Sequence, residues 1–481
     1  MDHDVGVPEP HDVQVPAHSI ERLGRLIGPE RYEKLEKAAA AALQSLDGAR
    51  VWNISSTAHG GGVAEMLQLL CGYAKDAGVD ARWVVIDADP EFFAITKRLH
   101  NRIHGAAGDV GDLGPREAAH YQAVLDANVD AIDGRINRDD IVFLHDPQTA
   151  GLANHLIGYG VHVAWRCHIG SDRTNTFTEE AWSFLQPHLA HCRTFVFSHA
   201  AFVPARLAGA DVWIIEPSID PLSAKNRPLS RTQVSNLLAG IGLLGGAGDG
   251  HAPAVMGGAG PFSPDDPLVV QVSRWDHLKD MQGVLRGFAE HLAGRTDARL
   301  ALIGPAVAGV GDDPEGAQVL EECFEMWRSL PRRARDAIRL VTLPMEDPVA
   351  NAFTVNATQR HASVVVQKSL QEGFGLTVTE AMWKSRPVVA SAVGGIVGQV
   401  PPGTGILLGD PSDLDAFGWS LTTLLADPAK MASMGRRARR HVRQHSLSDR
   451  HLIDYARLVA HMASLPRSSR PGPPTGRSAA P

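Results

Sequence analysis

Cysteine is scarce in this chain. Only four cysteines are present among 481 residues, and no two have the Cys-x-x-Cys spacing of zinc ligands or redox pairs. A disulfide framework and a structural zinc site are therefore not expected, and the thiols are predicted to be reduced. They are Cys71, Cys167, Cys192 and Cys323.

Long apolar runs and an excess of positive charge are also missing. No run approaches the roughly 18 apolar residues that a membrane span needs. The acidic, Pro-rich start MDHDVGVPEPHDVQVPAH has no apolar signal-peptide core. With 46 basic and 54 acidic residues the net charge is −8, which does not favour a nucleic-acid partner. The sequence therefore predicts a cytoplasmic protein with no membrane span and no nucleic-acid partner.

What is present is a repeated alternation of short apolar strands and amphipathic helices. The alternation occurs as two sets, separated by the Gly/Pro/Ala-rich stretch GGAGDGHAPAVMGGAGPFSPDD. Alternating β and α segments are typical of parallel sheets covered by helices. The sequence predicts an α/β protein with two Rossmann-like lobes. Expected strands are 51–54, 82–86, 140–144, 161–166, 194–197 and 212–216, then 268–272, 299–303, 338–343, 362–366 and 387–391.

The expected domain division follows from these shifts in pattern. It consists of an N-terminal extension at 1–48, partly helical and disordered over 1–17, a first lobe at 49–225, a Gly/Pro-rich linker or insert at 226–266, a second lobe at 267–440, a C-terminal helix at 441–463 and a disordered tail at 464–481. A formal GxGxxG at Gly240–Gly245 is rejected as a dinucleotide fingerprint, because it follows a helix-like segment and not a strand.

The most informative stretch is KSLQEGFGLTVTEAMW, residues 368–383. It follows a predicted strand, and Gly373 and Gly375 precede a predicted helix. A strand, a Gly-rich turn and a helix together aim backbone N–H groups and the positive end of a helix dipole at one point. Glu372 lies in the turn and Glu380 about one turn into the helix. A ligand with phosphate and sugar groups suits such a site, although a solvated helix face is the alternative.

Two cations follow the first strand of the second set. Arg274 and Lys279 are five residues apart in SRWDHLK, where both side chains can reach one anion. Charge-assisted hydrogen bonds of this kind contribute roughly 1.5–3 kcal/mol each, which matters for a diphosphate. A salt-bridged surface turn explains the same pattern.

Polar and glycine residues also gather after strands of the first set. Gly60, Gly61 and Gly62 precede a helix, and Asp146 and His168 follow predicted strands. The carboxyl ends of parallel strands are where such sheets bind ligands. A flexible loop and satisfied structural side chains are the alternatives. No metal is assigned, because Asp87-Ala88-Asp89 has no accompanying His or second acidic cluster.

As a set, these residues resemble the retaining glycosyltransferase family 4 signature on the GT-B fold, in which two Rossmann-like lobes face each other across a deep cleft. Arg274, Lys279, EGFGL at 372–376 and Glu380 carry that resemblance. Several sequence segments are similar to segments of the trehalose glycosyltransferring synthases, and together they span roughly residues 51–445. They are VWNISSTAHGGGVAEML, HDPQTAGL, WRCHI, PSIDPLSAKN, QVSRWDHLKD, DDPEG and EGFGLTVTEAMWKSRPVVASAVGGI.

The resemblance implies an enzyme that joins glucose from a nucleoside-diphosphate glucose to free glucose, reversibly, to give α,α-trehalose. The second lobe would hold the nucleotide sugar as a co-substrate, with no tightly bound cofactor and no divalent metal required, and the first lobe would hold the acceptor. The resemblance assigns catalytic roles to Arg274, Lys279, Glu372 and His168, donor binding to Gly61, Gly62, Phe374, Gly375, Leu376, Thr377 and Glu380, and acceptor binding to Asp146 and Gln148.

A front-face substitution is the expected mechanism, because no carboxylate pair suited to double displacement is evident. A retaining trehalose phosphorylase is the nearest rival, followed by a family 4 transferase with another acceptor. Glu380 favours the nucleotide-dependent reaction, because a phosphorylase has no ribose to bind. The sequence does not determine which nucleotide base is preferred, nor whether the protein forms a homodimer.

Overall fold

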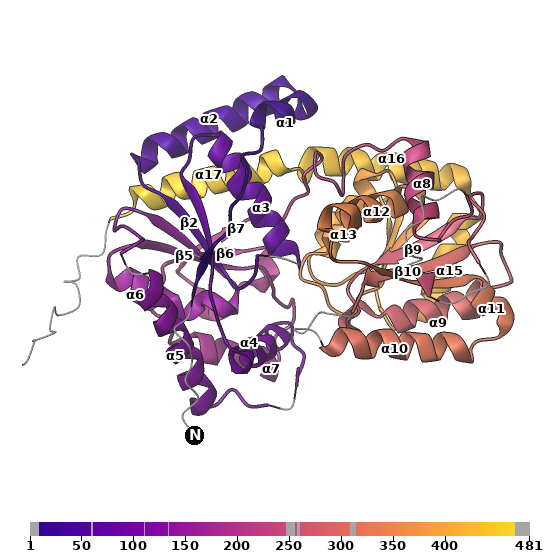
Figure 1. Ribbon diagram of the computed structural model, residues 1–481, viewed down its shortest axis with the longest axis horizontal. Helices are drawn as coiled ribbons and strands as arrows, with labels where there is room; N and C mark the ends of the chain where they lie inside the picture. The colour runs from indigo at the N-terminus through magenta and orange to yellow at the C-terminus, as the bar shows by residue number, and fades with distance from the viewer. Residues whose placement is uncertain are drawn as a thin grey trace, which may run out of the picture. The chain divides into compact units, whose positions relative to one another are not determined.

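The computed structural model describes residues 9–58, 61–109, 111–132, 134–246, 255–256, 260–307 and 314–466. These residues form two units (Figure 1). The first unit contains the chain up to Pro217 together with the residues from Asp449 onward, and the second contains Ser218–Ser448. The division therefore lies at Pro217–Ser218 and not at the predicted 225, and the chain returns to the first unit at its C-terminal end.

The first unit is built on a sheet with the order β1-β3-β2-β4-β5-β6-β7 in the described part of the chain. All neighbours are parallel except β1, which pairs antiparallel with β3. The strands are β1 (His11–Asp12), β2 (Val51–Ser55), β3 (Ala81–Val85), β4 (Ile141–His145), β5 (His162–Cys167), β6 (Thr194–Phe197) and β7 (Asp211–Ile214).

Strand β4 shows how this sheet is buried on both faces. Every residue of β4 is buried, which is typical of a parallel strand between two helical layers. Because side chains alternate along a strand, Ile141 and Phe143 pack in one cluster with α2 and α17, while Val142 and Leu144 pack in another with α4, α5 and α7. The helices are α1 (Ile20–Ile27), α2 (Pro29–Leu46), α3 (Gly61–Asp76), α4 (Pro90–Ile103), α5 (Pro115–Ile132), α6 (Ala153–Gly158), α7 (Thr176–Leu185) and α17 (Ser448–Ser464).

The second unit repeats this plan. Its sheet has the order β14-β13-β12-β9-β10-β11-β8 among the described residues, and β8 alone of these strands pairs antiparallel. The strands are β8 (Val255–Met256), β9 (Leu268–Val272), β10 (Arg299–Pro305), β11 (Ile338–Leu343), β12 (Val364–Gln367), β13 (Val388–Ser391) and β14 (Ile406–Leu408). The central position of β9 places the loop after it beside the loop after β12.

Helices of the second unit enclose the sheet. Side chains of β9, β10, β11, β12 and β13 share one buried cluster with α9, α10 and α15, whereas α12 and α13 also contact strands of the sheet. The helices are α8 (Arg231–Gly240), α9 (Met281–His291), α10 (Pro314–Ser329), α11 (Arg332–Asp336), α12 (Pro348–His361), α13 (Leu376–Trp383), α14 (Ile396–Gln399), α15 (Leu414–Leu425) and α16 (Pro428–His445).

Three segments differ from the sequence-based expectation. Residues 9–17 are ordered and not disordered, because β1 pairs with Val84 and Val85 and Val15 is buried. The predicted linker at 226–266 contains α8, a helix with a reciprocal cap between Ser230 and Gln233. The predicted helix at 441–463 is two helices, since Ser446 and Leu447 separate α16 from α17. Residues 1–8, 247–254, 257–259 and 467–481 of the predicted extension, linker and tail lie outside the described residues.

The structure also bears on the GxGxxG motif and on membrane-spanning helices. Helix α8 ends at Gly240, so the GxGxxG at Gly240–Gly245 follows a helix and its rejection is confirmed. Within the described ranges, none of the helices combines the length and the apolar character that crossing a membrane requires.

Candidate active site

Charged side chains from two loops of the second unit meet where β9 and β12 end. These strands are parallel neighbours, with Val269 opposite Val364 and Val270 opposite Val365, so the loops that follow them run side by side. Buried Gln271 joins the two loops: its Nε2 donates to the Lys279 carbonyl at 2.7 Å, and its Oε1 accepts from the Lys368 amide at 3.0 Å. The Leu370 amide also donates to the Leu278 carbonyl at 2.8 Å.

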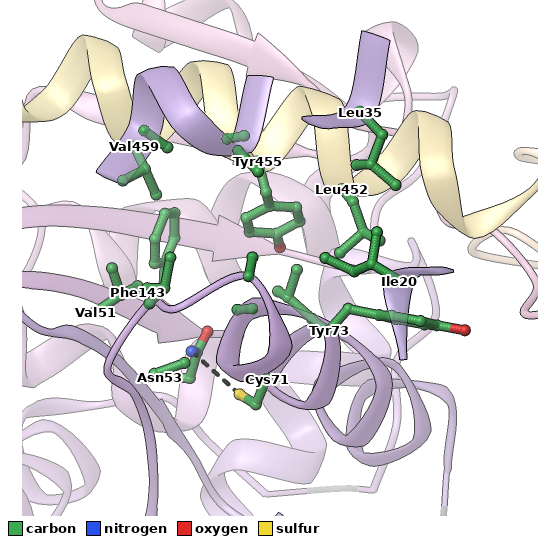
Figure 2. A pocket seen from close by; sticks show the side chains of 18 residues that line it. Ile20, Leu35, Val51, Asn53, Cys71, Tyr73, Phe143, Leu452, Tyr455 and Val459 are labelled. Carbon is green, nitrogen blue, oxygen red and sulfur yellow. Dashed lines mark hydrogen bonds between the residues drawn. The ribbon is translucent and has the colours of Figure 1, made fainter. Parts of the chain in front are cut away.

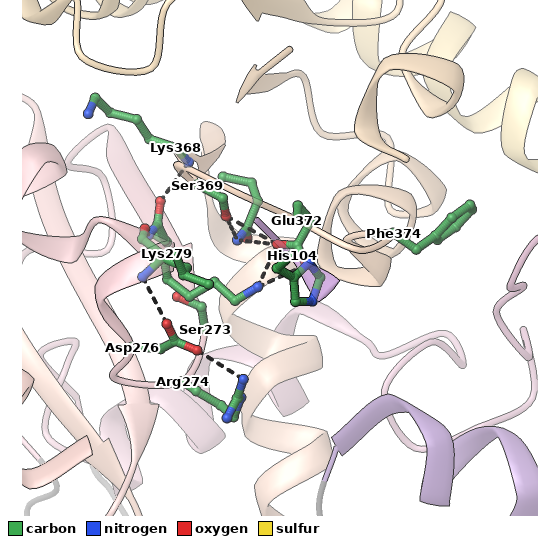
Figure 3. A network of polar contacts seen from close by, with 12 residues as sticks. His104, Ser273, Arg274, Asp276, Lys279, Lys368, Ser369, Glu372 and Phe374 are labelled. Atoms are coloured by element: carbon green, nitrogen blue, oxygen red, sulfur yellow. Dashed lines mark hydrogen bonds and ion pairs between the residues drawn. The ribbon is translucent and has the colours of Figure 1, made fainter. Parts of the chain in front are cut away.

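Lys279 and Glu372, which are 93 residues apart in sequence, form an ion pair at this place (Figure 3). Lys279 Nζ lies 2.8 Å from Glu372 Oε1 and 2.7 Å from Oε2. The Ser369 hydroxyl donates to Glu372 Oε2 at 3.1 Å. The two side chains are only 16% and 10% exposed, so a largely desolvated ion pair stands beside the Gly-rich turn. Both residues were predicted here, but their pairing was not.

Arg274 lies in the same loop but nearer to solvent. Its side chain is 47% exposed, and Nη2 contacts Asp276 Oδ2 at 3.0 Å. Asp276 is buried and also accepts from the Leu278 amide at 2.8 Å, which fixes the short turn of 3₁₀ helix at His277–Lys279. The loop therefore holds both predicted cations, each with a carboxylate partner.

Lys368 is a functional candidate to which the sequence analysis gave no role. It is 1% exposed and forms an ion pair with Asp280. Asp280 has a left-handed backbone (φ 49°) and caps α9 by accepting from the Gly283 amide at 3.0 Å. The sequence could have indicated this residue, because Lys368 directly follows an apolar strand. A cation buried at that position requires a partner from a neighbouring loop.

The Gly-rich turn is held in place by a second glycine pair. Gly375 has φ 84° and precedes α13, which begins without a side-chain cap in the part of the chain that the structure describes. The first amides of such a helix have no intrahelical acceptor, so Leu376 and Thr377 present N–H groups at this end. Gly395 donates to the Gly373 carbonyl at 3.0 Å, and a Cβ at Gly394 would lie 1.8 Å from the Glu372 carbonyl oxygen.

Gln399 completes this arrangement by donating to the Phe374 carbonyl and accepting from Thr379 Oγ1. The sequence segment VGGI, residues 393–396, could have indicated the glycine pair Gly394 and Gly395. The sequence analysis used this segment only as part of the family resemblance.

Glu380 is 6% exposed within α13. The neighbouring Lys384 is buried and donates to the Glu380 carbonyl at 3.1 Å, to Gln359 Oε1 at 2.7 Å and to Asn226 Oδ1 at 3.0 Å. Burial lowers the pKa of Lys384 to about 7, against the opposing effect of Glu380. The sequence analysis assigned no role to Lys384.

In the first unit, Asp146 and His168 meet at the ends of the parallel neighbours β4 and β5. The His168 amide donates to Asp146 Oδ1 at 2.7 Å, and Asp146 has a left-handed φ of 62°. Burial raises the pKa of Asp146 to about 7, although the His168 amide and Arg166 oppose this shift. The structure therefore brings together these two of the predicted residues.

The side chain of His168 belongs to a directional chain of hydrogen bonds. Burial lowers the pKa of His145 to about 3 and that of His168 well below its usual value, so both rings are neutral at pH 7. Arg166 Nε lies 3.3 Å from His168 Nδ1, His168 Nε2 lies 3.0 Å from His145 Nδ1, and His145 Nε2 lies 3.1 Å from Asn53 Oδ1.

The two ends of this chain fix the direction of each bond. Arg166 Nε can only donate and Asn53 Oδ1 can only accept. His168 therefore accepts at Nδ1 and donates from Nε2, and His145 does the same. We refer to Arg166, His168, His145 and Asn53 as the histidine chain. Of its members, the sequence analysis named only His168, because the pairing of strand-end side chains depends on sheet order.

The remaining predicted residues of the first unit lie in the segments that follow β2 and β4. Gly61 has φ 76° and begins α3, followed by Gly62, while Gly60 lies outside the described residues. Gln148 is in the 3₁₀ helix Pro147–Leu152 that follows Asp146. Asp89, from the short acidic motif, caps α4 through the Phe92 amide at 2.8 Å. Among the described residues, no group of three or more His, Cys, Asp or Glu side chains is arranged to hold a metal ion.

Comparison with known proteins gives the family. Residues 53–204 match the family model described as trehalose synthase, N-terminal domain, and residues 350–441 match glycosyl transferases group 1. The chain is 34% identical to a trehalose synthase from Rubrobacter xylanophilus over 439 residues, which is 91% of this chain and 95% of that protein. It is 27% identical to a trehalose phosphorylase from Pleurotus pulmonarius over 81% of this chain and 54% of that protein.

Solved structures share the fold. An α,α-trehalose-phosphate synthase (UDP-forming) from Burkholderia vietnamiensis superposes with a TM-score of 0.67 and 15% identity, over 88% of this chain and 98% of that one. The predicted GT-B class is confirmed. Taken with the matches along most of the sequence, this makes the chain a member of the trehalose synthase family of glycosyltransferases.

Proposed function

We propose that this protein is a retaining glucosyltransferase that makes α,α-trehalose from a nucleoside-diphosphate glucose and free glucose, in a reversible reaction. The observation that carries the proposal is the cluster of Lys279, Glu372 and Arg274 beside the uncapped start of α13. Such a cluster suits a ligand that has both a diphosphate and a sugar. The trehalose synthase relative, matched over 95% of its length, supports trehalose as the product.

In this proposal, Lys279 and Arg274 neutralise the diphosphate that leaves. A lysine ammonium has three N–H donors, so Lys279 can keep a bond to Glu372 while another N–H reaches a phosphate oxygen. Donors that are already oriented stabilise charge developing in the transition state without further reorganisation. The amides of Phe374, Gly375, Leu376 and Thr377 support the phosphates and the sugar, and Glu380 accepts hydrogen bonds from ribose hydroxyls.

The ion pair also bears on the reaction path. A double displacement needs a carboxylate nucleophile, yet both oxygens of Glu372 accept from Lys279 and one accepts from Ser369. Glu372 is therefore better suited to binding hexose hydroxyls. We propose a front-face substitution instead. The bond from the anomeric carbon to the phosphate oxygen breaks, the acceptor hydroxyl oxygen bonds to that carbon from the same face, and the hydroxyl proton passes to the departing phosphate.

The first unit is proposed to bind uncharged sugar groups. Its strand-end residues His168 and His145 are neutral at pH 7, and neutral polar groups suit hydroxyls better than phosphates. Asp146 and Gln148 are proposed to contact the acceptor glucose, His168 to contact the donor sugar, and Gly61 and Gly62 to allow close approach of the diphosphate.

One panel of assays tests the proposal. Purified protein is incubated with glucose and, in separate tubes, with ADP-, UDP- or GDP-glucose, and trehalose is measured by chromatography. We expect trehalose and the matching nucleoside diphosphate in equal amounts from at least one donor. A Lys279→Ala variant serves as the control, and trehalose formed equally by this variant would contradict the site.

The phosphorylase reaction is the alternative, since the chain also resembles a trehalose phosphorylase at 27% identity. The chain spans only 54% of that protein, which favours the synthase. A parallel tube with trehalose and inorganic phosphate separates the two reactions. Glucose 1-phosphate formed there, with no trehalose in the nucleotide tubes, would replace our proposal with the phosphorylase.

A further inference from the structure

A cavity lies inside the first unit, and Asn53 of the histidine chain is one of the residues that line it (Figure 2). Helices α2, α3 and α17 and strands β2 and β4 supply its walls. Leu35, Val51, Phe143 and Val459 are among the lining side chains, and each of them is buried. The glycosyl transfer proposed above makes no use of this space.

The cavity is large enough for a small organic molecule. Its volume is about 70 Å³. One water needs roughly 10–15 Å³ on this measure, so the space equals that of about five waters. A molecule of about five to seven non-hydrogen atoms fits, whereas a hexose with 12 does not. A hexose would also bury its hydroxyls against apolar side chains, which costs about 1–3 kcal/mol for each hydroxyl left without a partner.

The polar side chains on the walls carry no charge. Burial raises the pKa of Cys71 to about 12, so its thiol is protonated at pH 7. Asn53 is already engaged, because Oδ1 accepts from His145 and Nδ2 lies 3.6 Å from Cys71 Sγ. A charged ligand therefore finds no counter-charge among these groups.

Tyr455 is the exception among these satisfied groups. It is 4% exposed, and its hydroxyl has no hydrogen-bond partner in the part of the chain that the structure describes. Figure 2 shows the Tyr455 side chain reaching from α17 with its hydroxyl directed into the space between the lining side chains. Burial raises the pKa of this hydroxyl to about 12, so it keeps its proton and can donate. Buried polar atoms in proteins nearly always have a partner.

We propose that this cavity is a binding site for a small, uncharged, mainly apolar molecule whose single oxygen acceptor receives the hydrogen bond from the Tyr455 hydroxyl. The apolar walls hold the body of the molecule, and Tyr455 fixes its orientation. The proposed glycosyl transfer places no substrate in this cavity, although Asn53 belongs both to the cavity wall and to the histidine chain.

Two probes of equal size test the proposal. Cyclopentanone has one oxygen acceptor, and methylcyclopentane has a methyl group in its place. Binding of each to the full-length protein is measured by NMR titration of the Tyr455 region and by saturation transfer to the probe. We expect the affinity for cyclopentanone relative to methylcyclopentane to fall about tenfold from wild type to Tyr455→Phe, which corresponds to one hydrogen bond. Both probes should still bind Tyr455→Phe, and an unchanged ratio of affinities would contradict the role of the hydroxyl.

A matched pair of alanines on α2 gives the second arm. Ala39 lines the cavity, whereas Ala40 is exposed on the same helix. Ala39→Leu fills the cavity and should abolish binding of both probes, and Ala40→Leu should leave binding unchanged. This pair keeps the test valid if Tyr455→Phe does not fold. Failure of both probes to bind the unmodified protein, or equal binding of cyclopentanone to Ala39→Leu and Ala40→Leu, overturns the proposal.

Discussion

The two units place polar residues after the same kind of strand, yet they treat charge in opposite ways. In the second unit, the ion pairs Lys279–Glu372 and Lys368–Asp280 are largely withdrawn from solvent. In the first, the rings of His145 and His168 are neutral, and burial raises the pKa of the Asp146 carboxyl. A parallel sheet of similar size in each unit therefore does not fix the chemistry of a strand end.

This difference shows how one fold can serve two kinds of ligand group. In the second unit, Lys279 can exchange a hydrogen bond with Glu372 for one with a phosphate. The free-energy cost is modest, because the lysine is already largely desolvated. Uncharged side chains held in place by a chain of hydrogen bonds suit the uncharged groups of a sugar. Each experiment below changes one side of the comparison.

The largest effect is expected from the charged side. Lys279→Ala removes the ammonium group that we propose neutralises the leaving diphosphate, and it leaves Glu372 as an unpaired carboxylate. Turnover of the nucleotide sugar should fall by about a hundredfold to a thousandfold, measured as kcat for trehalose formation. Lys430→Ala, at an exposed lysine on α16 of the same unit, should be normal. Turnover within twofold of wild type in Lys279→Ala would remove this residue from the site.

Arg274→Ala should have a similar direction with a smaller effect, since Arg274 is half exposed and water screens its charge more strongly. The fall in kcat should be about tenfold to a hundredfold, with the melting temperature unchanged. The ratio of the two effects measures how much the desolvation of Lys279 contributes. Equal effects would contradict the idea that burial makes Lys279 the stronger group.

The Gly-rich turn gives the third test. Gly375→Ala imposes a side chain at φ 84°, where its Cβ would lie 3.0 Å from Ile396 Cγ1 and 3.2 Å from Glu372 Cγ. The left-handed backbone alone costs about 1–2 kcal/mol for a residue other than glycine. Unfolding by urea should show that loss of stability, and KM for the nucleotide sugar should rise. Gly398→Ala is the control, because a methyl group added at Gly398 would meet open space; it should not lower stability, since alanine favours a helix more than glycine does, and KM should be unchanged.

The neutral side is tested by Asn53→Leu. Because Asn53 Oδ1 accepts from His145, removing it leaves the His145 Nε2–H group without this acceptor, while Arg166 still donates to His168 Nδ1. In wild type, ¹⁵N NMR should show His145 and His168 protonated at Nε2 and bare at Nδ1. In Asn53→Leu we expect the same tautomers, because Arg166 still fixes them, and a fall in kcat of several-fold because His145 loses its acceptor, with the signals of His120, which bonds to Asp89, unchanged. A wild-type spectrum with Nδ1–H on either ring would disprove the assigned direction of the chain.

The smallest effect concerns pH. Burial lowers the pKa of His145 to about 3, and it also lowers those of His168 and His451. Below about pH 6.5 the unfolded chain binds protons that the folded chain does not, so stability is lost as the pH falls from 6.5 toward 3. Asp146 acts in the opposite direction between about pH 4 and 7, because burial raises its pKa to about 7.

The three histidines together should lower the stability in acid by more than the Asp146 carboxyl raises it. We expect the melting temperature to fall by about 5 °C between pH 7 and pH 5, measured by calorimetry, and His145→Gln to show a smaller slope. A melting temperature that is flat or rises over this interval would contradict the neutral assignment.

Much of this architecture could be predicted from the sequence, because hydrophobic periodicity and the Gly and Pro residues that end helices and strands are local features. The strands at β9 and β12, the helix α13 and the positions of Gly373 and Gly375 follow from a few neighbouring residues. The residues that meet across the sheet could not be predicted this way. Lys279 reaches Glu372 only because β9 and β12 are neighbours, and His145 reaches Asn53 only because β4 and β2 are.

Errors of the sequence analysis have a similar physical origin. The segment at β1 has two paired residues and little apolar pattern, so its order depends on the edge of β3 that it covers. Helix α8 lies beside low-complexity sequence, and composition concealed its Ser230–Gln233 cap. The break between α16 and α17 coincides with Ile219 pairing with Leu447 and with Ser446 accepting from the Ile219 amide, a contact across more than 200 residues.

The return of the chain to the first unit has a consequence for its synthesis. Tyr455, Leu458 and Val459 of α17 belong to the same buried cluster as Val51 and Phe143. When a ribosome has translated the first 217 residues, one wall of that cluster has not yet been made. Ser218–Ser448 can complete its sheet as soon as it emerges, whereas the half that was translated first must wait for the last helix. Folding order is thus expected to run against the order of translation, with the early half exposed to chaperones for the longer time.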